Sequence, residues 1–128
     1  MMANNNENDN QSQQNGGALN PQQRRAIIGY DISFYEIYLE GNDLSLATIK
    51  QIASLYEVNF VKAKAILSKG KIFISKGHPL KIFFWLNKFH QLGLNYKIYP
   101  NFPYDPFLFA DEDLSFHQKH WKLGDEPA

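Results

Sequence analysis

The chain of 128 residues has room for one domain with flanking segments, and 44% hydrophobic residues are enough for a core. It contains no cysteine, which excludes disulfides, thiolate metal sites and cysteine nucleophiles. The longest apolar run, 82–86, is too short to cross a bilayer, and the Asn/Gln-rich start has no apolar stretch typical of a secretory signal. We therefore expect a soluble, cytoplasmic protein that does not bind membranes.

The formal net charge of +0 hides an uneven distribution along the chain. Residues 44–100 contain nine lysines and a single acid, Glu57, which is a net charge of +8, and acids outnumber bases on both sides of this segment. A basic middle of this kind is either a solvated surface partly neutralised by the acidic flanks or a patch for an acidic partner or nucleic acid.

Three segments are expected from the composition. Residues 1–25 are rich in Asn and Gln and bury too little apolar surface to offset chain entropy, so we predict a disordered tail. Residues 26–100 form the domain, which begins with a short apolar lead-in. Residues 101–128 form a tail with aromatic, proline and acidic residues that packs on the domain or on a partner.

The first half of the domain predicts a strand and two helices. Tyr35, Ile37 and Leu39 fall on one face of residues 33–40, and Glu36 and Glu40 fall on the other, which indicates a strand with one buried face. After the turn at 41–43, Ser45 or Asp43 can cap a helix whose buried stripe is Ile49, Ile52, Ala53 and Tyr56. Asn59 can cap a second helix that buries Ala63, Ile66 and Leu67 and ends at Gly70.

The second half predicts a strand, a third helix and a last strand. Residues 71–75 form the strand, and the helix runs from Pro79 to Leu92 and ends at Gly93. Residues 82–86 are all apolar, so this helix needs cover on a second face as well. Residues 95–99 form the last strand. The expected fold class is α+β: a β-α-α-β-α-β two-layer sandwich with a three-stranded antiparallel sheet and three helices on one face.

The prolines at 100, 103 and 106 forbid a regular helix in the tail and favour extended chain. Phe102 and Tyr104 lie between these prolines and residues 107–109 follow them, and all five are apolar or aromatic. We expect this aromatic segment to cover the outer face of the third helix near Phe84 and Trp85. The alternative is that the same apolar patch forms a homodimer through the third helix.

Motifs in residues 49–98 resemble those of the C-terminal domain of the bacterial ribosomal stalk protein, and the Clp protease adaptor shares that fold. The matching positions are Ile49-Lys50, Ile52, Leu55, Val58, Phe60, Ala63-Lys64-Ala65-Ile66-Leu67, Gly77, Phe89, Leu92, Gly93, Tyr96 and Ile98. The resemblance implies the β-α-α-β-α-β fold and partner contacts through the first two helices. The family's Gly-Leu-Gly turn reads Glu57-Val58-Asn59 here, and only Lys50 and Lys64 match its basic positions.

No catalytic constellation is present in the sequence, and we expect neither an enzyme nor a cofactor. His117 and His120, with Asp113 four residues before His117, have a spacing that could place metal ligands on one helix face, although ordinary surface histidines also fit. No metal site is therefore predicted.

Two functions remain open. The first is a non-enzymatic adaptor or inhibitor module that binds an acidic protein surface; the expected partner-binding residues are Lys50, Lys62, Lys64, Lys69, Phe84 and Trp85. The alternative is nucleic-acid binding through lysines with interleaved aromatics, namely Lys71, Phe73, Lys76, Lys81, Trp85 and Lys88. The absence of arginine from residues 44–100 favours the first function.

Overall fold

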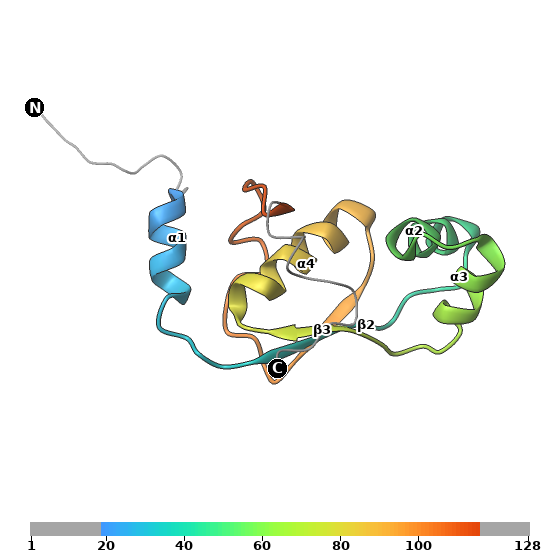
Figure 1. Ribbon diagram of the computed structural model, residues 1–128, viewed down its shortest axis with the longest axis horizontal. Coiled ribbons are helices and arrows are strands. Elements are labelled where there is room, and N and C mark those ends of the chain that lie inside the picture. Colours follow the sequence, from blue (N-terminus) through green and yellow to red (C-terminus); the bar gives the residue numbers. More distant parts are fainter. Residues whose placement is uncertain (1–18, 116–128) are drawn as a thin grey trace, which may run out of the picture. The chain divides into compact units, whose positions relative to one another are not determined.

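The computed structural model describes residues 19–115 and divides into two units, Met1–Tyr30 and Asp31–Ala128. The first unit contains helix α1, Pro21–Ile28 (Figure 1). Asn20 Oδ1 accepts the N–H of Gln23 at 2.8 Å, and Gln23 Oε1 accepts the N–H of Asn20 at 2.9 Å, so a reciprocal capping box starts the helix. The helix includes residues 21–25, which the composition assigns to a disordered tail; residues 1–18 lie outside the described range.

The second unit carries the remaining elements. They are β2 (Tyr35–Leu39), α2 (Leu46–Tyr56), α3 (Phe60–Leu67), β3 (Ile72–Gly77), α4 (Pro79–Leu92) and β4 (Tyr96–Tyr99). The sheet order is β3-β2-β4, and both pairs are antiparallel. The α+β class, the β-α-α-β-α-β order and the three-stranded antiparallel sheet expected from the sequence are confirmed.

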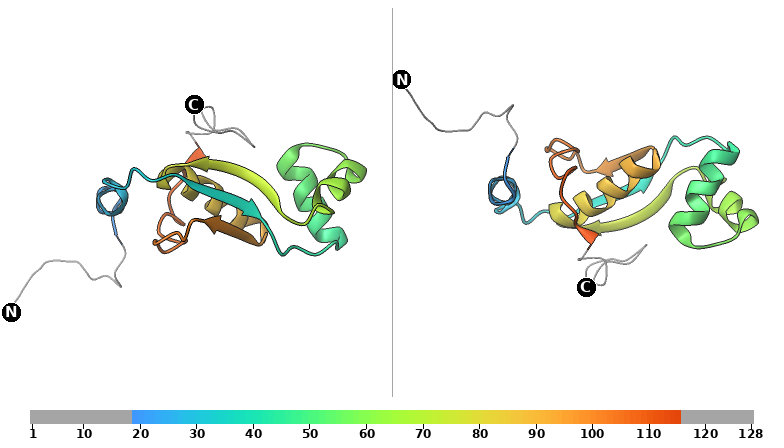
Figure 2. Two further views of the ribbon diagram at one scale, coloured as in Figure 1. Left: turned by 90° about the horizontal axis from the view of Figure 1, so that it is seen from below. Right: turned by 90° about the horizontal axis from the view of Figure 1, so that it is seen from above.

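Helix α4 lies against one face of this sheet, as the two views of Figure 2 show. The central strand β2 buries alternate residues, with Ile37 and Leu39 fully enclosed at 0% exposure. Ile82, Leu86 and Phe89 of α4 are also 0% exposed. The buried residues of β2 and the apolar residues of α4 therefore form one core.

Helices α2 and α3 pack on each other beyond one end of the sheet (Figures 1 and 2). Their buried residues are Ile49 and Ile52 of α2 and Ala63 and Leu67 of α3. The side chains of Ser45 and Asn59 cap the two helices, as the sequence predicts: each accepts a hydrogen bond from a backbone N–H in the first turn of its helix. Of the three helices expected on one face of the sheet, α4 alone lies across it, because α2 and α3 bury their apolar stripes mainly in their own hairpin.

Residues 101–115, here called the strap, cover the side of α4 around Phe83. The ring centroid of Phe83 lies 5.2 Å from that of Phe102 and 4.7 Å from that of Phe109. Phe102 also meets Tyr35 of β2 edge-on at 5.0 Å. The strap therefore supplies the second cover that the apolar run of α4 requires.

A carboxylate fastens the strap to the start of β2. Asp31 accepts hydrogen bonds from the hydroxyl of Tyr104 in the strap and, at 2.7 Å, from that of Tyr35. The Tyr104 hydroxyl, followed by that of Tyr35, holds the pKa of Asp31 well below its usual range. Asp31 is therefore ionised at neutral pH and links two segments that are distant in the sequence.

Asn87 provides a second attachment between α4 and the strap. Its Nδ2 donates to the carbonyl of Phe109 at 2.8 Å and to the carbonyl of Glu112 at 3.2 Å. We expect Asn87→Ala to lower the free energy of unfolding by about 1–3 kcal/mol, because two strap carbonyls lose their donor. Urea unfolding measures this change.

The matched control is Gln91→Ala, one turn further along α4 at an exposed position, with an expected effect within about 0.5 kcal/mol. Equal destabilisation by the two substitutions would contradict the role of Asn87 in holding the strap.

His90 on α4 is enclosed by aromatic groups from two other segments. Its ring stacks on Phe107 of the strap with centroids 4.1 Å apart, and its Nε2 lies 2.8 Å from the hydroxyl of Tyr96 in β4. Its Nδ1 is buried without a hydrogen-bond partner in residues 19–115. Burial lowers the pKa of His90, because removal from water disfavours the charged form of its ring.

Stability should therefore depend on pH through His90. Because the pKa of His90 is lowered on folding, the unfolded chain binds the proton more readily than the folded chain. The folded state is therefore most stable, as far as His90 is concerned, above the ordinary histidine pKa of about 6.5, and its stability declines as pH falls below that value. Urea unfolding between about pH 5 and pH 8 should show this decline in the wild type and a smaller one in His90→Gln. Parallel curves for the two proteins would contradict the assignment.

Glu57 ends α2 in the left-handed conformation, with φ 56° and ψ 49°. A side chain in this conformation costs about 1 kcal/mol or more relative to glycine. We expect Glu57→Gly to raise the free energy of unfolding by about 0.5–1 kcal/mol, after allowance for the greater chain entropy of glycine. Glu57→Ala keeps the strain and removes the charge, so a comparable gain in that variant would assign the effect to charge.

Candidate binding surfaces

The four lysines expected to bind a partner lie on the hairpin of α2 and α3. Lys50 is on α2, Lys62 and Lys64 are on α3, and Lys69 follows the end of α3. All four are exposed.

The lysines of α3 do not form one continuous row. Successive residues of an α-helix are about 100° apart, so Lys62 and Lys64 project about 200° apart around the axis. Val61, at 76% exposure, and the exposed Ala65 are one turn apart and lie between them. The result is a short apolar stripe with Lys64 on one side and Lys62 on the other, and Lys69 follows the end of the helix. Val61, Lys62, Lys64, Ala65 and Lys69 are called the α3 surface below.

Phe84 and Trp85 do not join these lysines. Both are on α4 and are buried at 4% exposure each, with ring centroids 5.0 Å apart. Their rings are enclosed within the chain itself, so neither is available to contact a partner as expected, and a homodimer through this helix stays a prediction.

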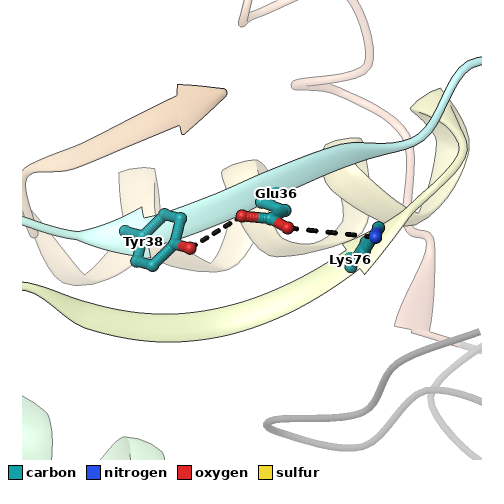
Figure 3. Close-up of polar contacts among 3 residues, drawn as sticks. All are labelled: Glu36, Tyr38 and Lys76. Atoms are coloured by element: carbon teal, nitrogen blue, oxygen red, sulfur yellow. Dashed lines mark hydrogen bonds and ion pairs between the residues drawn. The ribbon is translucent and has the colours of Figure 1, made fainter. Parts of the chain in front are cut away.

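A second surface is the face of the sheet that points away from α4. In strand register, Tyr38 pairs with Phe73 and Lys97, and Glu36 pairs with Lys76 and Tyr99. Paired residues of neighbouring strands project to the same face, and Figure 3 shows Glu36, Tyr38 and Lys76 together in front of the strands with α4 behind. The sheet surface, as it is called below, consists of Glu36, Tyr38, Glu40, Lys71, Phe73, Lys76, Lys97 and Tyr99.

A β-bulge assembles this surface. Strict alternation in β3 would put Phe73 and Lys76 on opposite faces of the sheet, because they are three residues apart. The register shifts between Ile37 and Tyr38 of β2, and the extra residue in β3 leaves Ile74 and Ser75 both buried at 0% exposure. Phe73 and Lys76 consequently lie on the same face.

The rings of the sheet surface contact one another and one ammonium group. Tyr38 meets Phe73 and Tyr99 edge-on, with centroids 5.5 and 5.6 Å apart respectively. Lys71 Nζ lies 4.7 Å from the centroid of Tyr38 and 4.5 Å from that of Tyr99. A cation at these distances is attracted by both rings.

The two carboxylates of the sheet surface are engaged by neighbours. Glu36 accepts a hydrogen bond from the hydroxyl of Tyr38 at 2.7 Å, and its other carboxylate oxygen lies 3.9 Å from Lys76 Nζ (Figure 3). Glu40 accepts the hydroxyl of Tyr99 at 3.0 Å, and this hydrogen bond is the main cause of the raised pKa of Tyr99. With three lysines and two carboxylates, the sheet surface keeps a net positive charge.

The aromatic and basic residues predicted for nucleic-acid binding separate into two groups. Lys71, Phe73 and Lys76 belong to the sheet surface, whereas Lys81, Trp85 and Lys88 are on α4. Tyr38, Lys97 and Tyr99 complete the sheet surface. These three residues were not predicted from the sequence, since their signal is only an aromatic or basic residue at the polar positions of a strand.

Within residues 19–115, no group of three or more His, Asp or Glu side chains could hold a metal ion. Asp113 is in the described range, but His117 and His120 lie outside it. No helix of the described range has the length and apolar character needed to span a membrane.

The resemblance to the stalk-protein C-terminal domain stays a prediction, since nothing in the comparisons with known proteins bears on it. No protein-family model, curated protein or solved structure matches the chain.

Proposed function

We propose that the protein is a non-enzymatic interaction module that binds an acidic protein surface through the α3 surface. The observation that carries the proposal is the exposed stripe of Val61 and Ala65 with lysines on both sides. Protein interfaces commonly have an apolar centre and a polar rim, and this part of α3 has both on a small scale.

The charge of the hairpin supports an acidic partner. Residues 46–67 contain three lysines, Lys50, Lys62 and Lys64, and one acid, Glu57. Long-range attraction of this kind speeds association with a negatively charged protein and depends on salt. The resemblance to the stalk protein points to the same helices, because that family contacts its partners through them.

Phe60 enlarges the candidate interface. It occupies the first position of α3 beside Val61 and is 45% exposed. A partially exposed aromatic ring one turn before Lys64 is a suitable anchor at the edge of the α3 surface, since aromatic side chains commonly supply much of the binding energy of an interface.

The test is affinity capture from the native cell, with cross-linking and mass spectrometry to map contacts on the bait. We expect the Lys62→Glu/Lys64→Glu variant to lose its partner by about tenfold or more, since two charges at the interface become repulsive. Cross-links in the wild type should reach Lys62, Lys64 or Lys69.

The matched control reverses two charges on the other surface, Lys76→Glu/Lys97→Glu, and should keep the same partner. Circular dichroism checks that both variants fold. A partner that is retained by the α3 variant, or lost equally from both variants, would contradict binding through the α3 surface.

A further inference from the structure

We propose that the sheet surface is a second binding site and that its ligand is single-stranded nucleic acid. Bases would stack on Tyr38, Phe73 and Tyr99, and Lys71, Lys76 and Lys97 would contact the phosphates. The site shares no residue with the α3 surface and does not depend on the function proposed for it.

The first argument is the position of the rings. A sheet face turned toward water is ordinarily lined with polar residues, yet each strand here contributes an aromatic ring to it. Tyr99 is 38% exposed, and Tyr38 and Phe73 are half-buried. Seen from below in Figure 2, the strands lie in front of α4, and no other helix of residues 19–115 crosses them.

The second argument is the alternation of rings with cations. Lys97 pairs with Tyr38 across β2 and β4, and Lys71 Nζ lies over the rings of both Tyr38 and Tyr99. Each nucleotide of a single strand offers a flat base that can stack on a ring and a phosphate that can contact an ammonium group, so alternating rings and lysines match a single strand. Lys71 is exposed, and its flexible side chain can move from the rings to a phosphate when a base takes its place.

Third, both acids on this face are engaged by neighbouring side chains. Glu36 is paired with Lys76 and accepts the Tyr38 hydroxyl, and Glu40 accepts the Tyr99 hydroxyl. Their charges are thus partly offset by neighbours on the same face. Residues 44–100, which include the three lysines of the sheet surface, contain nine lysines and one acid, and this local excess of positive charge favours a polyanion as ligand.

The ligand must be single-stranded for the rings to act. In a duplex the base faces are stacked on each other and only their edges and the phosphates are accessible. The sequence preference should be weak, because every base has a π-face and residues 44–100 contain no arginine for bidentate contacts with base edges.

The experiment uses the full chain and fluorescence anisotropy with labelled oligo-U RNA and oligo-dT DNA of roughly 12 nucleotides, within the usual range of single-strand sites. We expect binding at low salt that weakens steeply as salt rises from about 50 to 200 mM. A duplex of the same length should bind at least about fivefold more weakly, because it cannot use the rings.

Two substitutions of Tyr99 separate stacking from folding. Tyr99→Leu should weaken single-strand binding by about fivefold or more, the usual effect of losing one stacked base. Tyr99→Phe keeps the ring and loses only the hydroxyl bonded to Glu40, so its affinity should stay within about twofold of the wild type. Thermal unfolding of both variants shows whether the fold is intact.

Two lysine substitutions locate the phosphate contacts. Lys97→Gln should reduce the slope of log affinity against log salt by about 0.7, the value for one phosphate of a single strand. Lys62→Gln makes the same change in charge on the α3 surface and should leave the slope unchanged.

Any of these results would overturn the proposal: no binding at low salt, equal affinity for duplex and single strand, unchanged binding by Tyr99→Leu, or equal effects of Lys97→Gln and Lys62→Gln. Competition by poly-glutamate as effective as that by oligonucleotide would also overturn it, because the surface would then recognise acidic protein by charge alone. None of these results bears on partner capture through the α3 surface.

Discussion

The cover required by α4 is the constraint on which the arrangement of the second unit depends. Five consecutive apolar residues, 82–86, surround more than half of this helix, and all five are buried. The sheet can take only one side of a helix. Burial of a large apolar side chain stabilises a fold by about 1.5–3 kcal/mol, so the remaining rings need a second layer. The strap is that layer, with Phe102 and Phe109 placed against Phe83.

Polar contacts then fix the strap in one position. Asp31 joins it to β2 through two tyrosine hydroxyls, and Asn87 joins it to α4 through two backbone carbonyls. Apolar contacts alone are non-directional and would tolerate several placements of an extended segment. Hydrogen bonds to a carboxylate and a buried amide select one of them.

With α4 covered on both sides, the two surfaces that we propose as binding sites are the outer side of the hairpin and the far side of the sheet. The hairpin contributes Val61 and its flanking lysines, and the sheet contributes Tyr38, Phe73 and Tyr99 with lysines between them. Both surfaces are basic, which follows from the charge of residues 44–100. They differ in shape: one is a convex helix, and the other is a sheet face whose rings are partly exposed.

The sequence by itself determined the local elements. Alternation in residues 35–39 specified the buried face of β2, and Ser45, Asn59 and Gly93 specified helix ends, because these signals act over a few neighbouring residues. The capping box of Asn20 and Gln23 was equally readable, yet the polar composition of the N-terminus outweighed it and α1 was missed. The apolar run at 82–86 also indicated that a second face of α4 had to be covered.

Only the tertiary structure decided what the elements present to solvent. The burial of Phe84 and Trp85 depends on long-range packing, and the place of α2 and α3 beyond the sheet depends on which apolar stripes meet. The shared face of Phe73 and Lys76 results from a bulge in a strand pairing between residues far apart in the chain. Such contacts are non-local, so no pattern within β3 alone could have revealed the sheet surface.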